Sequence, residues 1–190
     1  MSKLLNLEHQ MPFYGAYHTN STNVSIHMIF VPVILYTVFI FLSNTGPLID
    51  QHSGIWPSFF PESNAAALLA LLTIPGYVVM QPSAGLLAAP VILAMVTSAR
   101  YLTQTFGASA NWYGGAIHVL SWVMQFVGHG VYEGRKPALL DNIFQAFYLA
   151  PFFVFLEILF SLGWNKELQQ KLGKLTAQRR AELCCTWYVY

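Results

Sequence analysis

Long apolar runs separated by short polar breaks dominate this chain. The first run, Ile26 to Leu42, follows Asn20-Ser21-Thr22-Asn23, whose short side chains can cap the free amides at a helix start. Pro32 lies inside the run, and a membrane helix tolerates proline when neighbouring groups satisfy the freed carbonyl. The pattern therefore predicts a break at Asn20 to Asn23 and then a kinked membrane span.

Two further apolar blocks, Ala65 to Met80 and Ala84 to Ala99, are separated by Gln81-Pro82-Ser83. A helix needs about 20 residues to cross a hydrocarbon core of ~30 Å, so both blocks are short. We predict a tight hairpin of short spans or a partly re-entrant pair. Residues 43–64, rich in turn formers and interfacial aromatics, are predicted to form an external loop.

The second half of the chain contains two more apolar segments. Arg100 to Tyr113 is polar enough to predict a connection, and the apolar pattern returns in Gly114 to Tyr132. That segment carries polar groups that a lipid-facing helix would not hold, so they should face protein or an internal cavity. A last apolar run, Ile143 to Gly163, is broken at Pro151.

The composition strengthens the membrane interpretation. Hydrophobic residues make up 55% and charged residues 9%, with a mean hydropathy of +0.48, whereas soluble domains carry about 25% charged residues. We predict an all-α integral membrane helical bundle of about four to five apolar helices, some broken by proline. We expect residues 1–165 to form one membrane-embedded domain and the basic tail, residues 166–190, to contain an amphipathic helix. The net charge of +1 gives no reason to expect nucleic acid as a partner.

Four of the six histidines lie in two polar patches: His18 with His27, and His118 with His129. Nine residues apart on one helix, His18 and His27 would point in opposite directions, but a break at Asn20 to Asn23 lets both face the junction. His118 and His129 share a helix face at a separation of about 16 Å, too far for one metal. Either the chain bends at Gly128 and Gly130, or the two histidines serve different ends of a cavity or two metals.

Other polar residues near the histidines have several possible roles. Glu133 follows His129 by four residues and could add a carboxylate to the same ion. Gln125 could donate a hydrogen bond to a ligand histidine. Arg135 and Lys136 could contact lipid headgroups or hold a substrate carboxylate. Each histidine could also simply form a hydrogen bond between helices.

A resemblance gives these residues a context. Tyr17-His18, Asn23 and His27, together with the block from Trp122 to Asn142, resemble the fungal and bacterial family of the endoplasmic-reticulum 2-hydroxy-fatty-acid dioxygenase, which acts in phytosphingosine degradation. The resemblance covers roughly Leu4 to Trp164. It implies an iron(II)-dependent membrane enzyme that uses O2 to shorten a long-chain 2-hydroxy fatty acid by one carbon with release of CO2, a fatty acid α-oxidation.

The resemblance also suggests roles for particular residues. The expected location is the endoplasmic-reticulum membrane in a eukaryote or the cell membrane in a bacterium. The candidate residues are, for metal binding, His18, His27, His129 and, with a less distinctive setting, His118; for catalysis, Glu133 and Gln125; and for substrate binding, Arg135, Lys136 and Asn23.

Three other function classes use the same residues differently. A non-enzymatic lipid-binding or scaffold protein would need only the apolar bundle, with structural histidines. A zinc-dependent membrane hydrolase is possible because imidazole suits zinc as well as iron. A di-iron desaturase is disfavoured because its HxxxH and HxxHH boxes are absent from the chain.

Overall fold

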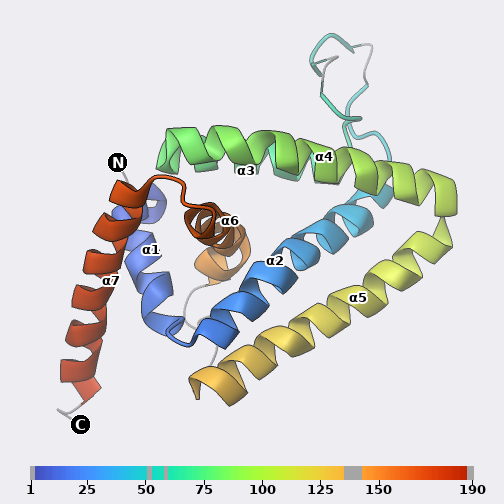
Figure 1. The fold of residues 1–190 in the computed structure, drawn as a ribbon. Coiled ribbons are helices and arrows are strands. Elements are labelled where there is room, and N and C mark those ends of the chain that lie inside the picture. Colours follow the sequence, from blue (N-terminus) through green and yellow to red (C-terminus); the bar gives the residue numbers. More distant parts are fainter. Residues whose placement is uncertain (1–2, 51–52, 58–59, 135–142, 188–190) are drawn as a thin grey trace. The chain divides into compact units, whose positions relative to one another are not determined.

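The computed structural model describes residues 3–50, 53–57, 60–134 and 143–187, and all regular secondary structure within these ranges is helical (Figure 1). The prediction of an all-α fold is confirmed. The α-helices are α1 (Leu7–Tyr17), α2 (Ser21–Leu42), α3 (Ala65–Met80), α4 (Pro82–Phe106), α5 (Ala108–Val127), α6 (Ala150–Ser161) and α7 (Lys166–Trp187). Two further segments are π-helical. The segment η4 (Gly128–Glu133) continues directly from α5, and η6 (Gln145–Leu149) leads directly into α6.

Polar side chains mark the helix starts, as the capping argument requires. The Asn20 side chain accepts a hydrogen bond from the backbone amide of Thr22 (2.9 Å), which caps α2 as predicted. The predicted break exists, but it lies at residues 18–20 rather than Asn20 to Asn23, because α2 already begins at Ser21. Four other side chains cap a helix start in the same way, each by accepting a hydrogen bond from a backbone amide three residues later. These pairs are Asn6 with His9, Asn64 with Ala67, Gln81 with Ala84, and Asn165 with Leu168.

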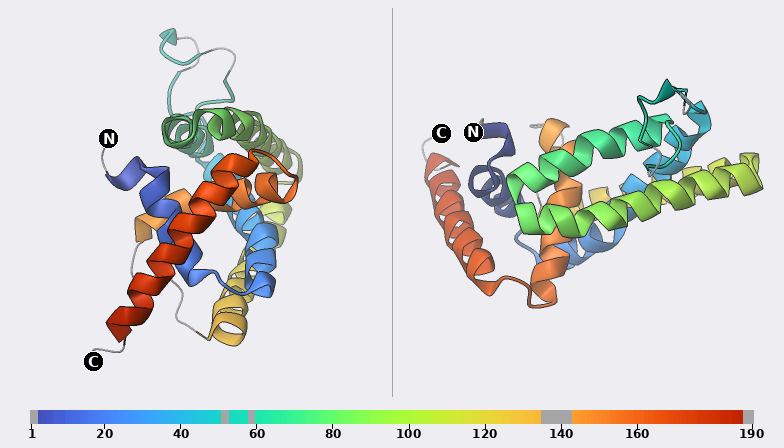
Figure 2. Two further views of the ribbon diagram at one scale, coloured as in Figure 1. Left: turned by 60° about the vertical axis from the view of Figure 1, so that its left-hand side comes forward. Right: turned by 90° about the horizontal axis from the view of Figure 1, so that it is seen from above.

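The chain folds as two compact units, and both boundaries between them fall inside a helix, within α2 and within α5. Figure 2 shows α2 in blue and α5 in yellow. One unit comprises Met1–Ile29 with Met124–Tyr190 and is called the terminal unit below. The other comprises Phe30–Val123 and is called the central unit.

The central unit contains the predicted hairpin, formed by α3 and α4. Small side chains line the contact: Ala67 and Ala84 are fully buried, and a Cβ on Gly85 would lie 2.4 Å from the Val78 backbone nitrogen. Glycine and alanine allow the two backbones to approach closely, which is how helices associate without large side chains. The bounds of α3 match the first predicted block, whereas α4 is longer than the second.

The predicted connection from Arg100 to Tyr113 is wrong. α4 continues to Phe106, Gly107 turns the chain with φ +52°, and α5 begins at Ala108. The charge of Arg100 does not end the helix because its guanidinium pairs with Glu62 and also donates to the Ser43 carbonyl (3.3 Å).

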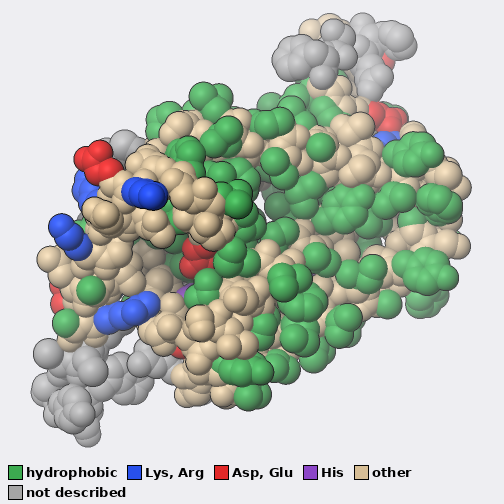
Figure 3. Space-filling view, in the orientation of Figure 1, with side chains coloured by type: hydrophobic (Ala, Val, Ile, Leu, Met, Phe, Trp, Pro, Cys, Tyr) green, Lys and Arg blue, Asp and Glu red, His purple; other side chains and the backbone are tan. Residues whose placement is uncertain are grey.

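Only two described helices are long and apolar enough to cross a membrane, the continuous segment Ser21–Thr45 and α4 (Pro82–Phe106), rather than the four to five predicted. α3 and the segment Gln145–Ser161 are apolar but shorter. At 1.5 Å per residue, the 16 residues of α3 fall short of a bilayer core. Many hydrophobic side chains nevertheless lie on the visible surface along α4 and α5 (Figure 3), and Leu86, Val119 and Phe126 are more than half exposed.

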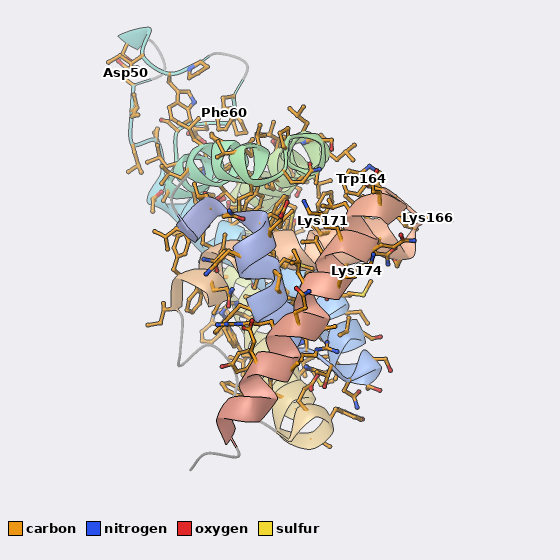
Figure 4. The ribbon with its side chains drawn as sticks, turned by 90° about the vertical axis from the view of Figure 1, so that its left-hand side faces the viewer. Asp50, Phe60, Trp164, Lys166, Lys171 and Lys174 are labelled. Atoms are coloured by element: carbon orange, nitrogen blue, oxygen red, sulfur yellow. The ribbon has the colours of Figure 1, made fainter. Side chains whose placement is uncertain are left out.

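The terminal unit is built on α1, α6 and α7. Phe152, Phe153 and Leu156 of α6 are fully buried, and Leu172 of α7 is 3% exposed. The predicted amphipathic helix of the basic tail is present as α7, with Lys166, Lys171 and Lys174 along it (Figure 4). α7 lies beside α1, and Lys171 forms an ion pair with Glu8.

Candidate metal centre

Three histidines from three separate segments of the terminal unit come together. His18 directly follows α1, His27 lies in the second turn of α2, and His129 belongs to η4. The ring centroids are 4.5 Å apart for His18 and His27, 5.0 Å for His18 and His129, and 4.9 Å for His27 and His129. One nitrogen of each ring lies within 4.8 Å of the others, and the three side chains are only 5–7% exposed. They form a nearly equilateral triangle of buried imidazoles.

Two of the imidazole rings are oriented by the same kind of hydrogen bond, from Nδ1 to a backbone carbonyl. The Nδ1 of His18 lies 2.8 Å from the carbonyl oxygen of Tyr14, and the Nδ1 of His27 lies 2.9 Å from that of Asn23. A carbonyl oxygen can only accept, so both Nδ1 atoms carry the proton and both Nε2 atoms keep a lone pair. A ligand histidine typically holds its second nitrogen in this way, which fixes tautomer and ring direction.

The arrangement leaves ligand atoms without partners. Among the described residues, His18 Nε2 and His129 Nδ1 are buried and make no hydrogen bond. A buried polar atom without a partner is costly, and a bound cation would remove that cost. Three imidazoles are a donor set that suits iron, zinc, copper or nickel. The residues present therefore fit a transition-metal ion.

The electrostatic setting keeps the ligands in their metal-binding form. Burial, and then the neighbouring His27, lower the pKa of His18 well below the ordinary value of 6.5. Burial also lowers the pKa of His129, against the opposing effect of the Glu133 charge. Neutral imidazole is the form that coordinates a metal, so these two side chains need not lose a proton near neutral pH.

Glu133 ties η4 to the start of α2. Its carboxylate accepts hydrogen bonds from the Thr19 amide (2.6 Å), the Thr19 hydroxyl (2.7 Å), the Asn20 amide (2.8 Å) and the Asn23 side-chain amide (3.1 Å). Partial burial raises the pKa of Glu133, but these bonds outweigh it and hold the pKa below its ordinary value. An anion at a helix N-terminus satisfies amides that have no partner within the helix.

Gly128 lets η4 approach α2 closely. A Cβ at this position would lie 2.3 Å from Oδ1 of Asn23, a fully buried side chain. Gly130 has open space where its Cβ would be. The segment that holds both glycines is a π-helix, a wider turn that is frequent at functional sites.

Comparison with known proteins now decides the family. The family model described as 2-hydroxy-palmitic acid dioxygenase Mpo1-like matches residues 4–162, which include all three clustered histidines. The chain belongs to the Mpo1-like family. It is 35% identical over 171 residues to the Saccharomyces cerevisiae protein named 2-hydroxy-palmitic acid dioxygenase MPO1, a match that covers 89% of this chain and 88% of that relative. No solved structure matches the chain. The predicted resemblance is confirmed.

The fourth predicted ligand of this Mpo1-like chain, His118, lies in the central unit. Its Nε2 accepts a hydrogen bond from the Trp122 indole (3.0 Å), so Nδ1 carries the proton and donates to the Thr37 hydroxyl (2.7 Å). The Thr37 hydroxyl in turn donates to carbonyls of its own helix. Both nitrogens of His118 are therefore occupied, and neither is left for a metal.

The remaining predicted site residues have different surroundings. Gln125 is 6% exposed, four residues before His129, and its Nε2 makes no hydrogen bond among the described residues. The side-chain amide of Asn23, predicted to bind substrate, donates to Glu133. Arg135 and Lys136 lie outside the described residues.

Sequence analysis missed Tyr14. Its ring stacks on His18 with centroids 3.9 Å apart and planes inclined by 21°, and its hydroxyl donates to Glu157 (3.3 Å). Since residues four apart on a helix share a face, Tyr14 could have been found from its spacing to His18.

Proposed function

We propose that this chain is an iron(II)-dependent dioxygenase that converts a long-chain 2-hydroxy fatty acid and O2 into the fatty acid one carbon shorter, CO2 and water. The observation that supports it most is the triangle of His18, His27 and His129, buried and preset to bind a metal. The chain is homologous to a protein named as a 2-hydroxy-palmitic acid dioxygenase, which supports this reaction class.

The proposed reaction balances without an external reductant. The bond between C1 and C2 of the substrate breaks, C1 leaves as CO2, and C2 is oxidised from an alcohol to a carboxylic acid. These changes release four electrons, which is the number that O2 accepts when one oxygen atom enters the acid and the other leaves as water. The substrate is therefore the only electron donor needed.

The chain's own residues would prepare the site for this chemistry. Iron(II) supplies a Lewis-acidic, redox-active centre that retains its positive charge when its protein ligands are neutral imidazoles. The Tyr14 and Asn23 carbonyls hold two of the rings in position, and burial keeps water from the histidines. The Gln125 amide, buried and with an unused donor, is suited to bind a substrate oxygen or to support His129.

We also propose a location in a membrane, that of the endoplasmic reticulum in a eukaryote or the cell membrane in a bacterium. Ser21–Thr45 and Pro82–Phe106 are long enough to span it. Large exposed hydrophobic side chains along α4 and α5 are typical of a lipid-facing surface. His27 lies on the first of these long segments, so an alkyl chain dissolved in the bilayer could reach the histidines without entering water.

Protein purified anaerobically in detergent tests the proposal. Loaded with iron(II) and given 2-hydroxypalmitate, it should consume one O2 for each CO2 and each pentadecanoate formed. Protein that contains zinc and hydrolyses lipid without oxygen uptake would favour the hydrolase instead. Metal-free protein that binds 2-hydroxypalmitate but does not turn it over would favour the scaffold.

A further inference from the structure

The C-terminal helix α7 lies beyond residues 4–162, the part that the family model covers, yet it contacts the segment that carries His18. The Arg180 guanidinium donates to the Gly15 carbonyl through Nη2 (2.7 Å) and Nε (3.2 Å). Its Nη2 also lies 3.2 Å from the carbonyl oxygen of His18 itself. A side chain from the far end of the chain thus holds the backbone on which a candidate metal ligand is mounted.

These carbonyls are the groups at the end of α1 that need a partner. The last carbonyl groups of a helix accept no hydrogen bond from a backbone amide of the same helix, and the helix dipole favours a cation near them. α1 has no basic residue in its own last turn, and the chain leaves helical geometry at His18, where φ is −121° and ψ is 82°. Arg180 supplies the missing cation.

Close packing fixes the position of Arg180 relative to α1. A Cβ on Gly15 would lie 2.9 Å from Cγ2 of Thr176, one turn before Arg180. The Thr176 hydroxyl donates to the Leu172 carbonyl (2.8 Å), which restricts the rotation of that side chain. The ion pair between Lys171 and Glu8 joins the same two helices at another point. Glycine at position 15 therefore lets α7 come near enough for the guanidinium to reach.

We propose that Arg180 is a positioning residue for the metal centre, which acts by fixing the C-terminal turn of α1 and through it the His18 imidazole. The inference rests on the proposed function, since it concerns the same histidines. The His18 ring is already directed by the Tyr14 carbonyl, and Arg180 holds the carbonyls of Gly15 and His18 on either side of that turn. Without the guanidinium, the last turn of α1 would fray and the ring would lose its fixed direction.

Cobalt(II) binding by the full chain in detergent under anaerobic conditions tests this role, with the visible absorption of the bound ion as the readout. R180A should weaken cobalt(II) affinity about tenfold, the lower end of the effect of residues that orient metal ligands, and should alter the spectrum. R180K should recover part of the affinity, because a lysine can satisfy one carbonyl but lacks the guanidinium fork. R179A is the matched control: Arg179 pairs with Glu182 on its own helix, so binding should be unchanged.

A second pair of variants tests the contact between Arg180 and α1 by changing the packing of α1 against α7. G15A should weaken cobalt(II) binding as R180A does, because the added methyl group pushes α7 away. G15A combined with T176A should restore it, since only the ordinary contact with Thr176 Cβ at 3.7 Å remains. If R180A does not yield folded protein, the comparison of G15A with the double variant decides the question.

The outcomes separate this inference from the proposed function. If H18A abolishes cobalt(II) binding while R180A and G15A bind as R179A does, the positioning role is wrong and the metal centre stands. If H18A also binds cobalt(II) normally, the metal centre is wrong and the inference falls with it.

Discussion

The histidine triangle of the terminal unit and His118 of the central unit show two uses of imidazole in apolar surroundings. His18 and His27 each donate to a backbone carbonyl four residues earlier, which leaves the second nitrogen with its lone pair. His118 donates to the Thr37 hydroxyl and accepts from the Trp122 indole, so its lone pair is in use. A carbonyl partner prepares a ligand, whereas an indole N–H donor takes the atom that a metal would need.

The difference teaches that position along the chain is insufficient to identify a ligand. All four histidines lie in or beside apolar helices, but the three of the triangle are buried and His118 is only half-buried. Both this burial and the partner of the second nitrogen are supplied by the fold.

The largest expected effect comes from removing a member of the triangle. H27A and H129A should each lower metal affinity by more than about 100-fold, since loss of a ligand exceeds the effect of residues that only orient one. Turnover should be lost, while helical content in detergent is retained. Metal content after dialysis and O2 uptake with 2-hydroxypalmitate are the measurements. H118A is the control and should keep its metal; if it loses metal as H27A does, the comparison between the two settings is wrong.

Replacing Glu133 by glutamine should have the next largest effect. The glutamine oxygen can take the place of Oε1 and accept from the Thr19 and Asn20 amides, but the amide lacks the negative charge that strengthens these bonds. Its NH2 group would also face the Thr19 hydroxyl that now donates to Oε2, so about 2 kcal/mol of stability should be lost, as for bonds to charged groups. Metal affinity should fall as well, because the start of α2 carries His27. Thermal unfolding in detergent measures the loss, and E8Q, on an exposed ion pair, should change little.

The pH dependence of this variant provides a second check. The pKa of Glu133 is lower in the folded protein than its ordinary value of 4.5, so its stabilisation is complete above that value and disappears as the pH falls through the lowered pKa. The stability difference between wild type and E133Q should therefore shrink below about pH 4.5. A difference that grows on acidification would contradict an ionised, stabilising carboxylate.

Gly128 and Gly130 form a matched pair for the contact between η4 and α2. In G128A the new methyl group would overlap Asn23 Oδ1, and overpacking of this kind should cost about 1.5 kcal/mol and displace His129. G130A adds its methyl group in open space and should be neutral. Unfolding midpoints and cobalt(II) affinity of the two variants measure the effect. Equal values for both would mean that the close approach at Gly128 does not hold the site together.

Local features of this fold were predictable from the sequence. The bounds of α3, the cap at Asn20 and the facing of His18 and His27 across the break all depend on residues near one another in the chain. The connection predicted at Arg100 to Tyr113 failed because Arg100 is paired with Glu62, 38 residues earlier. No local pattern contains that partner.

The composition of the site was predictable only in part for the same reason. His129 joins the triangle, and His118 does not, because of contacts such as that of Glu133 with Thr19, which are 114 residues apart. Arg180 reaches the His18 carbonyl across 162 residues. Helical spacing gave a separation of about 16 Å between His118 and His129 on a straight helix but left a bend at Gly128 and Gly130 open. It could not say which of the two belongs with His18 and His27.

The smallest expected effect comes from removing the hydroxyl group that accepts the hydrogen bond of His118. T37V preserves the shape of a buried side chain and removes the acceptor of His118 Nδ1, so it should cost about 1 kcal/mol of stability. Metal content and turnover should match the wild type, because the bond serves helix packing in the central unit. The double variant with H118A should be less destabilised than the sum of the single variants, since both remove the same bond. Loss of metal in T37V would mean that His118 contributes to the centre after all, and the distinction drawn from the nitrogen partners would fail.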